Sequence, residues 1–238
     1  MKSIVLCGDH PSAPINKLQN LGFTVISMPR FFSLDFPINS HCEMLMSIFE
    51  GYIITSEDYA SLANKQFEYI CDNTGLGLIT EKSPHLNGYP AEAKYNVLYH
   101  NKKLYCNTNY VSPSIYELCK RSSVPIIHTN QGYSACSVAK CSNGVITSDP
   151  SLVKAFNNNS ENVLYISKGY IAIDKYPYGF IGGASGYCAE NSTLYINGDI
   201  NLHPDANEII RFCELHNTHL YSLAQNSIPF DIGGIIFI

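Results

Sequence analysis

A short pattern recurs five times along the 238 residues, and this repetition constrains the fold more than any other feature of the sequence. Each copy is a run of apolar residues that ends in a small or polar pair, usually followed by an acidic residue or Asn. The copies occupy residues 4–9, 52–57, 104–109, 145–149 and 194–199. Repeats with a period of about 20–50 residues are typical of solenoids, propellers and other arrays of one supersecondary unit.

The copies are evenly spaced along the chain. The small residues near the ends of the five copies are Gly8, Ser56, Thr108, Ser148 and Gly198. Each is separated from the next by 48, 52, 40 and 50 residues in turn. Continuing from Gly198 through the C-terminus to Gly8 takes a further 48 residues. The chain therefore divides into five units of about 48 residues with nothing left over.

Each run leads into a segment that carries the signals of a helix start. Ser56, Ser112 and Asp149 stand where N-caps are preferred, and Pro113 and Pro150 suit a first helical turn. The expected helices cover residues 12–28 (ending near residues 21–22), 57–73, 113–121, 150–157 and 204–216. A strand is expected after each helix, at residues 24–28, 77–80, 125–129, 163–167 and 220–223.

Each unit also opens with a segment of small or functional residues, so the unit is strand–strand–helix–strand. These segments lie at residues 41–44, 95–97, 134–137, 182–186 and 231–234. The last one ends the chain, and its partners are the strand and helix at the N-terminus. Such a split unit pairs an edge that would otherwise be open and favours a closed ring. A solenoid, which would need capping ends, and an open α/β sheet are the alternatives. We expect one α/β-propeller domain over residues 1–238.

Composition narrows the classes of function. A net charge of −5 with only three arginines argues against a nucleic-acid-binding protein, which needs a basic face. No stretch approaches the ~20 apolar residues of a membrane span, and the N-terminal apolar run is too short for a signal peptide, so a cytoplasmic protein is expected. Nine cysteines without a C-x-x-C motif fit reduced thiols. No metal site is expected, because Cys7 and His10 form a lone C-x-x-H pair.

Five strand–strand–helix–strand units in a ring resemble the pentein, or guanidino-group-modifying, superfamily of α/β-propellers. The C-terminal half further resembles a bacterial branch of that superfamily, through the stretches GYSACSVAK, ITSDP, GFIGGASG, INGD, LHPD and DIGG. The superfamily includes arginine deiminases, dimethylarginine dimethylaminohydrolases and amidinotransferases, and also ribosome anti-association factors that are not enzymes. The resemblance implies the fold, and it leaves both an enzyme and a binding protein open.

The resemblance also implies catalytic residues. His41 and Glu43 match the His-x-acid motif of the superfamily's enzymes. Cys136 lies about two units after His41 and is followed by a small hydroxyl residue, so it matches the nucleophile. The order is circularly permuted relative to the usual enzymes, which end shortly after their Cys. Ala135 stands where those enzymes usually have a His.

Substrate-binding candidates come from two later units. Asp231 opens the stretch DIGG, which approximates the superfamily's acidic-Gly-Gly motif one unit before His41 around the ring. Asp199 matches an acidic residue that those enzymes place near the substrate. Gly183 and Ser185 belong to a glycine-rich segment that could contact a ligand.

The residue types fit attack on a guanidinium carbon, which is a poor electrophile because its charge is delocalised. A thiolate at Cys136 would be the nucleophile, and its activation needs a cationic neighbour or substrate. His41 would protonate the leaving amine and later activate water. Glu43 and Asp231 would hold the planar cation through charge-assisted hydrogen bonds. This chemistry requires no cofactor.

Each candidate also has a structural interpretation. Cys136 can be one of several buried apolar fillers, and His41 a core histidine. Glu43 can belong to an ion pair, and Asp231 can be a turn residue before two glycines. Asp199 can be a helix-leading cap. The glycine-rich segment can simply permit close backbone approach.

The leading prediction is a Cys-dependent hydrolase of the guanidino-modifying type, acting on a small, cationic, arginine-like guanidine or amidine. The alternative is a pentein without catalysis that binds a ligand or a protein partner. The two differ in geometry, because the hydrolase requires Cys136 and His41 to face one cavity together with at least two carboxylates.

Overall fold

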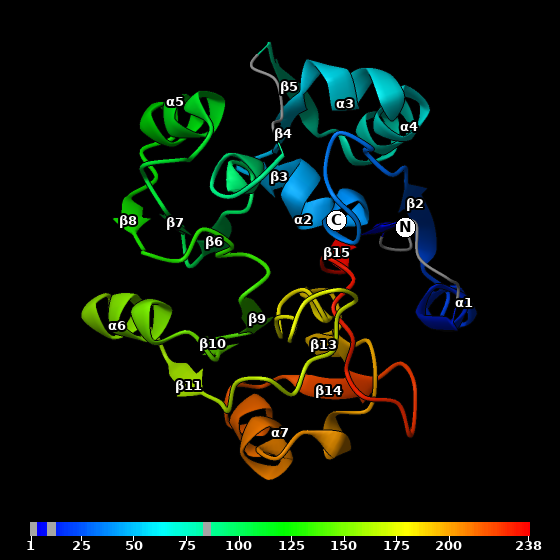
Figure 1. Ribbon diagram of the computed structural model, residues 1–238, viewed down its shortest axis with the longest axis vertical. Helices are drawn as coiled ribbons and strands as arrows, with labels where there is room; N and C mark the ends of the chain where they lie inside the picture. Colours follow the sequence, from blue (N-terminus) through cyan, green and yellow to red (C-terminus); the bar gives the residue numbers. More distant parts are fainter. Residues whose placement is uncertain (1–3, 9–12, 83–86) are drawn as a thin grey trace.

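A computed structural model describes residues 4–8, 13–82 and 87–238, so Asp9 and His10 lie outside the described residues. It contains five three-stranded sheets, which follow one another around the middle of the molecule in Figure 1. In each sheet the middle strand pairs antiparallel with one neighbour and parallel with the other. The middle strands are β1 (Ile4–Gly8), β4 (Tyr52–Ser56), β7 (Lys103–Cys106), β10 (Gly144–Thr147) and β13 (Thr193–Ile196).

The outer strands complete the predicted unit. The antiparallel neighbours are β15 (Ile236–Phe237), β3 (Met46–Phe49), β6 (Leu98–His100), β9 (Val138–Cys141) and β12 (Ser185–Cys188). The parallel neighbours are β2 (Thr24–Met28), β5 (Gly77–Glu81), β8 (Ile126–His128), β11 (Val163–Tyr165) and β14 (His219–Ser222). The predicted split unit is confirmed, because the C-terminal β15 and the N-terminal β1 and β2 form one sheet.

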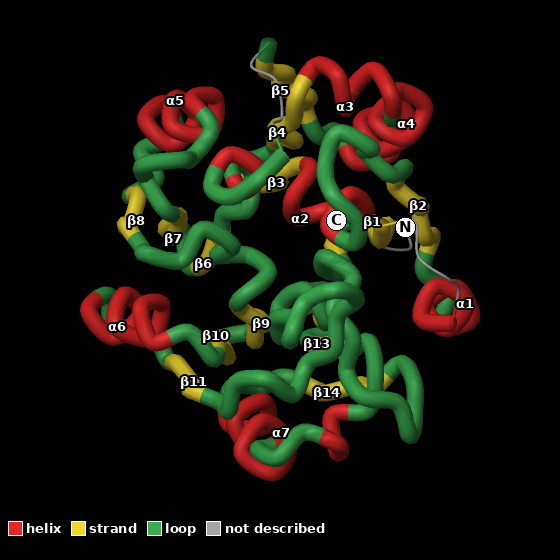
Figure 2. Tube along the Cα trace, viewed as in Figure 1, coloured by secondary structure: helices red, strands yellow, loops and turns green. Residues whose placement is uncertain are grey.

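A helical segment joins the middle strand of each sheet to its parallel neighbour, and these helices lie at the rim of the molecule in Figure 2. They are α1 (Ala13–Asn20), α3 (Glu57–Leu62) with α4 (Asn64–Thr74), α5 (Pro113–Arg121), α6 (Pro150–Asn158) and α7 (Ala206–Leu215). Four shorter helices are η1 (Ile38–Ser40), α2 (Cys42–Leu45), η2 (Ala91–Ala93) and η3 (Ile200–Leu202). None of the helices in the described part of the chain has the length and apolar character that crossing a bilayer requires.

The predicted caps form. The side chains of Ser56, Ser112 and Asp149 accept hydrogen bonds from backbone N–H groups in the first turns of α3, α5 and α6. The helix expected at residues 204–216 begins only at Ala206. The segment expected at residues 57–73 is interrupted at Ala63, whose N–H still donates to Tyr59 O over 2.9 Å.

Five apolar clusters join the sheets in cyclic order, one between each sheet and the next. The cluster around Leu6 and Ile53 joins the first two sheets, and the cluster around Val5 and Tyr195 joins the last sheet to the first. The middle strands are almost wholly buried, because each packs against neighbours on both faces. The segments that precede the antiparallel strands are hydrogen-bonded to one another, as between Asn96 and Cys136 and between Glu43 and Gly233.

Candidate active site

Three of the predicted site residues meet at one pocket, although they come from three different sheets. His41 precedes α2 and β3, Cys136 lies in the turn before β9, and Asp231 lies in the segment before β15. All three therefore occupy the same place in the repeating unit. The pocket has a volume of about 220 Å³. Its lining consists of Ile38, His41, Met44, Tyr133, Cys136, Ile173, Tyr176, Pro177, Tyr178, Gly179, Phe180 and Asp231.

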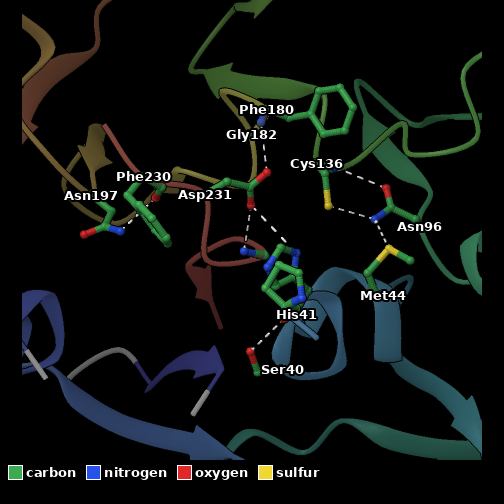
Figure 3. Close-up of polar contacts among 12 residues, drawn as sticks. Ser40, His41, Met44, Asn96, Cys136, Phe180, Gly182, Asn197, Phe230 and Asp231 are labelled. Carbon is green, nitrogen blue, oxygen red and sulfur yellow. Dashed lines mark hydrogen bonds and ion pairs between the residues drawn. The ribbon is translucent and has the colours of Figure 1, made fainter. Parts of the chain in front are cut away.

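Asp231 is fixed in this pocket by backbone donors. Its Oδ2 accepts a hydrogen bond from Phe180 N–H over 2.9 Å, and its Oδ1 accepts one from Gly233 N–H over 2.9 Å. Nδ1 of His41 lies 3.8 Å from the same Oδ1 (Figure 3). Because hydrogen bonds from N–H groups stabilise a carboxylate, this arrangement holds a negative charge beside the imidazole.

His41 is almost completely buried, with 2% of its surface exposed. Burial lowers its pKa to about 3, since a charged imidazolium would lose its hydration. At neutral pH the ring is consequently neutral, and it can act as a base only where a neighbouring negative charge, such as the Asp231 carboxylate, stabilises the imidazolium.

The thiol of Cys136 is 3% exposed and faces the same pocket. Burial raises its pKa well above the ordinary value, and the nearby Glu43 and Asp231 raise it further because they oppose a second negative charge. The hydrogen bond from Asn96 acts in the opposite direction. The protein without a ligand therefore holds this residue as a thiol.

Glu43 contacts Cys136 but does not line the same pocket. It lies against a second cavity of about 120 Å³ that Lys140 also lines. Burial raises the pKa of Glu43 to about 8, an effect that the hydrogen bond with Cys136 and the charge of Lys140 oppose and the charge of Asp231 reinforces. The hydrogen bond lowers the pKa of Glu43 and raises that of Cys136, so the thiol donates it and the Glu43 carboxylate accepts it.

Asn96 is a site residue that sequence reasoning missed. Its Nδ2 donates to Cys136 Sγ over 2.9 Å and to Met44 Sδ over 3.2 Å. Its Oδ1 accepts the backbone N–H groups of Ala135 and Cys136 over 2.8 and 3.2 Å. Its position in the repeat could have indicated it, because Asn96 lies in the opening segment of its unit, as His41 and Cys136 do in theirs.

The glycines near the site permit close packing, as one of the two interpretations predicted. A Cβ atom on Gly183 would lie 2.0 Å from Asp231 Oδ1, and one on Gly233 would lie 2.1 Å from His41 Cβ. Gly183 also donates its N–H to Cys136 O over 2.8 Å. Its backbone therefore joins the Cys136 turn to the Asp231 segment.

Two further candidates lie away from the pocket. Ser185 is in β12, where its hydroxyl donates to Gly182 O over 3.3 Å and its backbone pairs with Ile196. Asp199 caps η3, because its side chain accepts from Asn201 N–H and Asn226 N–H, and these bonds lower its pKa. The geometry at Asp199 is that of the cap considered from the sequence. Neither residue, nor Gly183, belongs to the pocket lining.

Among the described residues, no group of three or more His, Cys, Asp and Glu side chains is arranged to hold a metal ion. All nine cysteines are free thiols. The sulfur atoms of Cys141 and Cys213 lie 3.8 Å apart.

Solved structures with the same fold are guanidino-modifying enzymes. A dimethylarginine dimethylaminohydrolase in an adduct with 4-chloro-2-hydroxymethylpyridine shares 10% identity, with a TM-score of 0.59 over 93% of this chain and 92% of that one. SxtG, an amidinotransferase from Microseira wollei in the saxitoxin biosynthetic pathway, shares 9% identity, with a TM-score of 0.51 over 93% and 88%. A Pseudomonas aeruginosa dimethylarginine dimethylaminohydrolase mutant complexed with citrulline shares 9% identity. Its TM-score is 0.52, over 93% of this chain and 92% of that one.

These likenesses show the pentein fold that the resemblance implied. No curated protein matches the sequence significantly. One family model matches residues 7–236, and its description is a family of unknown function, DUF6873. Because the match covers nearly the whole chain, the protein belongs to the DUF6873 family.

Proposed function

We propose that the protein is a cysteine-dependent hydrolase of a small guanidine or amidine. The observation that carries the proposal is the convergence of Cys136, His41 and Asp231 on one pocket from three separate sheets. The Cys136 thiol, the hydrogen-bonded Asp231 carboxylate and the neutral His41 imidazole are the three groups that attack on a cationic carbon requires.

In the proposed reaction, the substrate cation binds beside Asp231 and His41 accepts the proton of the Cys136 thiol. The thiolate forms a bond to the guanidinium carbon, and the imidazolium returns the proton to the leaving amine as the carbon–nitrogen bond breaks. The product of this step is a covalent thiouronium intermediate. Water, deprotonated by His41, then attacks that carbon, and the carbon–sulfur bond breaks as the imidazolium returns the proton to Cys136 Sγ.

The raised pKa of Cys136 fits a thiol that the substrate itself activates. Glu43 and Asp231 are two of the causes of the raised pKa, and a bound cation would oppose both. Positive charge next to a thiol favours the thiolate. In this scheme Glu43 accepts a hydrogen bond from Cys136 at the second cavity and does not contact the substrate.

The same proposal takes the five sheets as blades of one α/β-propeller domain over residues 1–238. The cyclic order of the five apolar clusters and the sheet shared by the two termini support it. In a propeller, the segments that open the blades converge near the axis, which would explain how distant residues build one site.

A screen of guanidines and amidines for release of ammonia, urea or an amine tests the hydrolase. Turnover by the wild-type protein that Cys136→Ser abolishes would support it, together with a trapped adduct on Cys136 detected by mass spectrometry. Turnover that survives Cys136→Ser would contradict it, since Cys136 is the only Cys, Ser, Thr or Lys among the described residues that line the pocket.

A non-catalytic binding protein is the second candidate, and the burial of the Cys136 thiol favours it. In that case the pocket holds a cation without covalent chemistry. Binding of guanidines without turnover or adduct formation, unchanged by Cys136→Ser, would select this function over the hydrolase.

A further inference from the structure

We infer that the pocket takes a guanidine or amidine with an apolar, preferably aromatic, substituent, rather than a zwitterionic amino acid such as arginine. The inference rests on the proposed function for the cationic group of the ligand. The nature of the substituent follows from the remaining walls of the pocket.

The polar groups of the pocket are concentrated in few residues. Asp231 provides a carboxylate, and His41 and Cys136 complete the polar part of the lining apart from tyrosine hydroxyls. A cationic head would therefore bind at this end, where Asp231 is already oriented by Phe180 N–H and Gly233 N–H.

The rest of the lining is apolar and aromatic. It consists of Ile38, Met44, Ile173, Pro177, Gly179 and the rings of Tyr133, Tyr176, Tyr178 and Phe180. Phe180 packs against Tyr133 and Tyr178, with ring centroids 6.1 and 6.3 Å apart. Tyr89 continues this row of rings beyond the pocket, 5.4 Å from Tyr133. Covering an apolar substituent with these side chains removes apolar surface from water, which favours binding. The aromatic rings can also face a cation.

A carboxylate on the substituent has no counter-charge within the pocket. Among the described lining residues none is Lys or Arg. Lys168 lies outside the lining, 4.7 Å from the centroid of the Tyr178 ring, and Lys175 lies 4.9 Å from that of Phe36. Because an unpaired buried carboxylate is costly and Asp231 would repel it, arginine should bind poorly.

The test compares binding of N-benzylguanidine, methylguanidine and L-arginine to the Cys136→Ser protein by titration calorimetry. We expect N-benzylguanidine to bind at least about tenfold more tightly than either of the others, the gain reflecting the apolar surface buried. Tyr176→Ala should weaken the binding of N-benzylguanidine about fivefold or more and leave the affinity for methylguanidine unchanged. Tyr170→Ala is the matched control. Tyr170 and Tyr176 lie in the same loop and are similarly exposed, at 49% and 46%, but Tyr170 does not line the pocket.

Arginine binding as tightly as N-benzylguanidine would overturn the inference. So would a specific loss of arginine affinity in Lys168→Met, since it would show that Lys168 pairs with a carboxylate. Turnover is measured separately on the wild-type protein. Tight binding of N-benzylguanidine without turnover would contradict the hydrolase and support the inference, whereas faster turnover of arginine would support the hydrolase and contradict the inference.

Discussion

One side chain, Asn96, holds both the sulfur and the backbone of Cys136. Its Nδ2 donates to Cys136 Sγ over 2.9 Å, while its Oδ1 accepts Cys136 N–H over 3.2 Å. The two residues are 40 positions apart and open the units of neighbouring sheets. Asn96 thus fixes the direction of the thiol and contributes the one hydrogen bond among the causes of the Cys136 pKa that lowers it.

Replacing Asn96 by Ala should destabilise the protein. The change leaves the buried N–H groups of Ala135 and Cys136 without their acceptor, and unsatisfied buried donors cost about 1–3 kcal/mol each, so a loss of roughly 2–6 kcal/mol is expected. Urea denaturation measures it. Asn201→Ala removes an amide from an exposed residue and should cost less than about 1 kcal/mol. Equal losses in the two variants would show that the Asn96 contacts do not stabilise the turn.

Cys136 should react with a cationic alkylating agent in preference to a neutral one. Burial and two carboxylates raise its pKa, so iodoacetamide at pH 7.5 should modify the half-buried Cys71 first. The amidinium of 2-chloroacetamidine brings a positive charge to Asp231 and should reverse this order. Peptide mapping by mass spectrometry gives the two rates in one sample.

Asp231→Asn tests the cause of that preference. The variant keeps the shape of the side chain and removes its charge, so the advantage of the cationic reagent at Cys136 should fall about tenfold or more, while the Cys71 rates stay constant. Rapid labelling of Cys136 by iodoacetamide below pH 8 would instead reveal a thiolate that needs no ligand.

Stability should fall as pH rises because of Glu43. Its pKa is about 8 in the folded protein and 4.5 as an ordinary Glu, so the folded state binds the proton more tightly. This contribution is present below pH 4.5 and is lost as the pH rises through about 8. Glu43→Gln, which carries no charge, should therefore lie within about 1 kcal/mol of the wild type at pH 5 and exceed it by roughly 4 kcal/mol at pH 8.5.

Chemical denaturation at the two pH values checks this prediction. Glu57→Gln, at an exposed position in the first turn of α3, serves as the control and should show the same difference from wild type at both pH values. A pH-independent effect of Glu43→Gln would mean that the Glu43 carboxyl is ionised in the folded protein throughout this range.

Gly183→Ala should disturb the site through Asp231. The new methyl group would lie 2.0 Å from Asp231 Oδ1, and such overpacking costs about 1–3 kcal/mol. Gly132→Ala is a matched control, since its methyl group would meet the ring of Tyr89, an exposed side chain that can move aside. Thermal unfolding should separate the two, and a Gly183→Ala protein as stable as Gly132→Ala would show that the Asp231 segment shifts freely.

The repeat spacing was sufficient to predict the order of strands and helices in every sheet, because strand runs, caps and glycines act within a few residues. Ser56, Ser112 and Asp149 cap helices as their sequence context indicated. The same local signals could not distinguish a catalytic acid from a cap. Asp199 follows a strand just as a site residue would, yet its carboxylate accepts hydrogen bonds from Asn201 and Asn226.

The five-unit α/β fold, including the sheet shared by the two termini, could be predicted from the repeat pattern of the sequence. Which polar side chains share a pocket follows only from the packing of the sheets. Cys136, His41 and Asp231 line one cavity, whereas Glu43 contacts the sulfur and lines another. Asn96 is hydrogen-bonded to the sulfur and the backbone N–H of Cys136. These relationships depend on how sheets pack against one another, and no short-range pattern encodes the distance between side chains of different sheets.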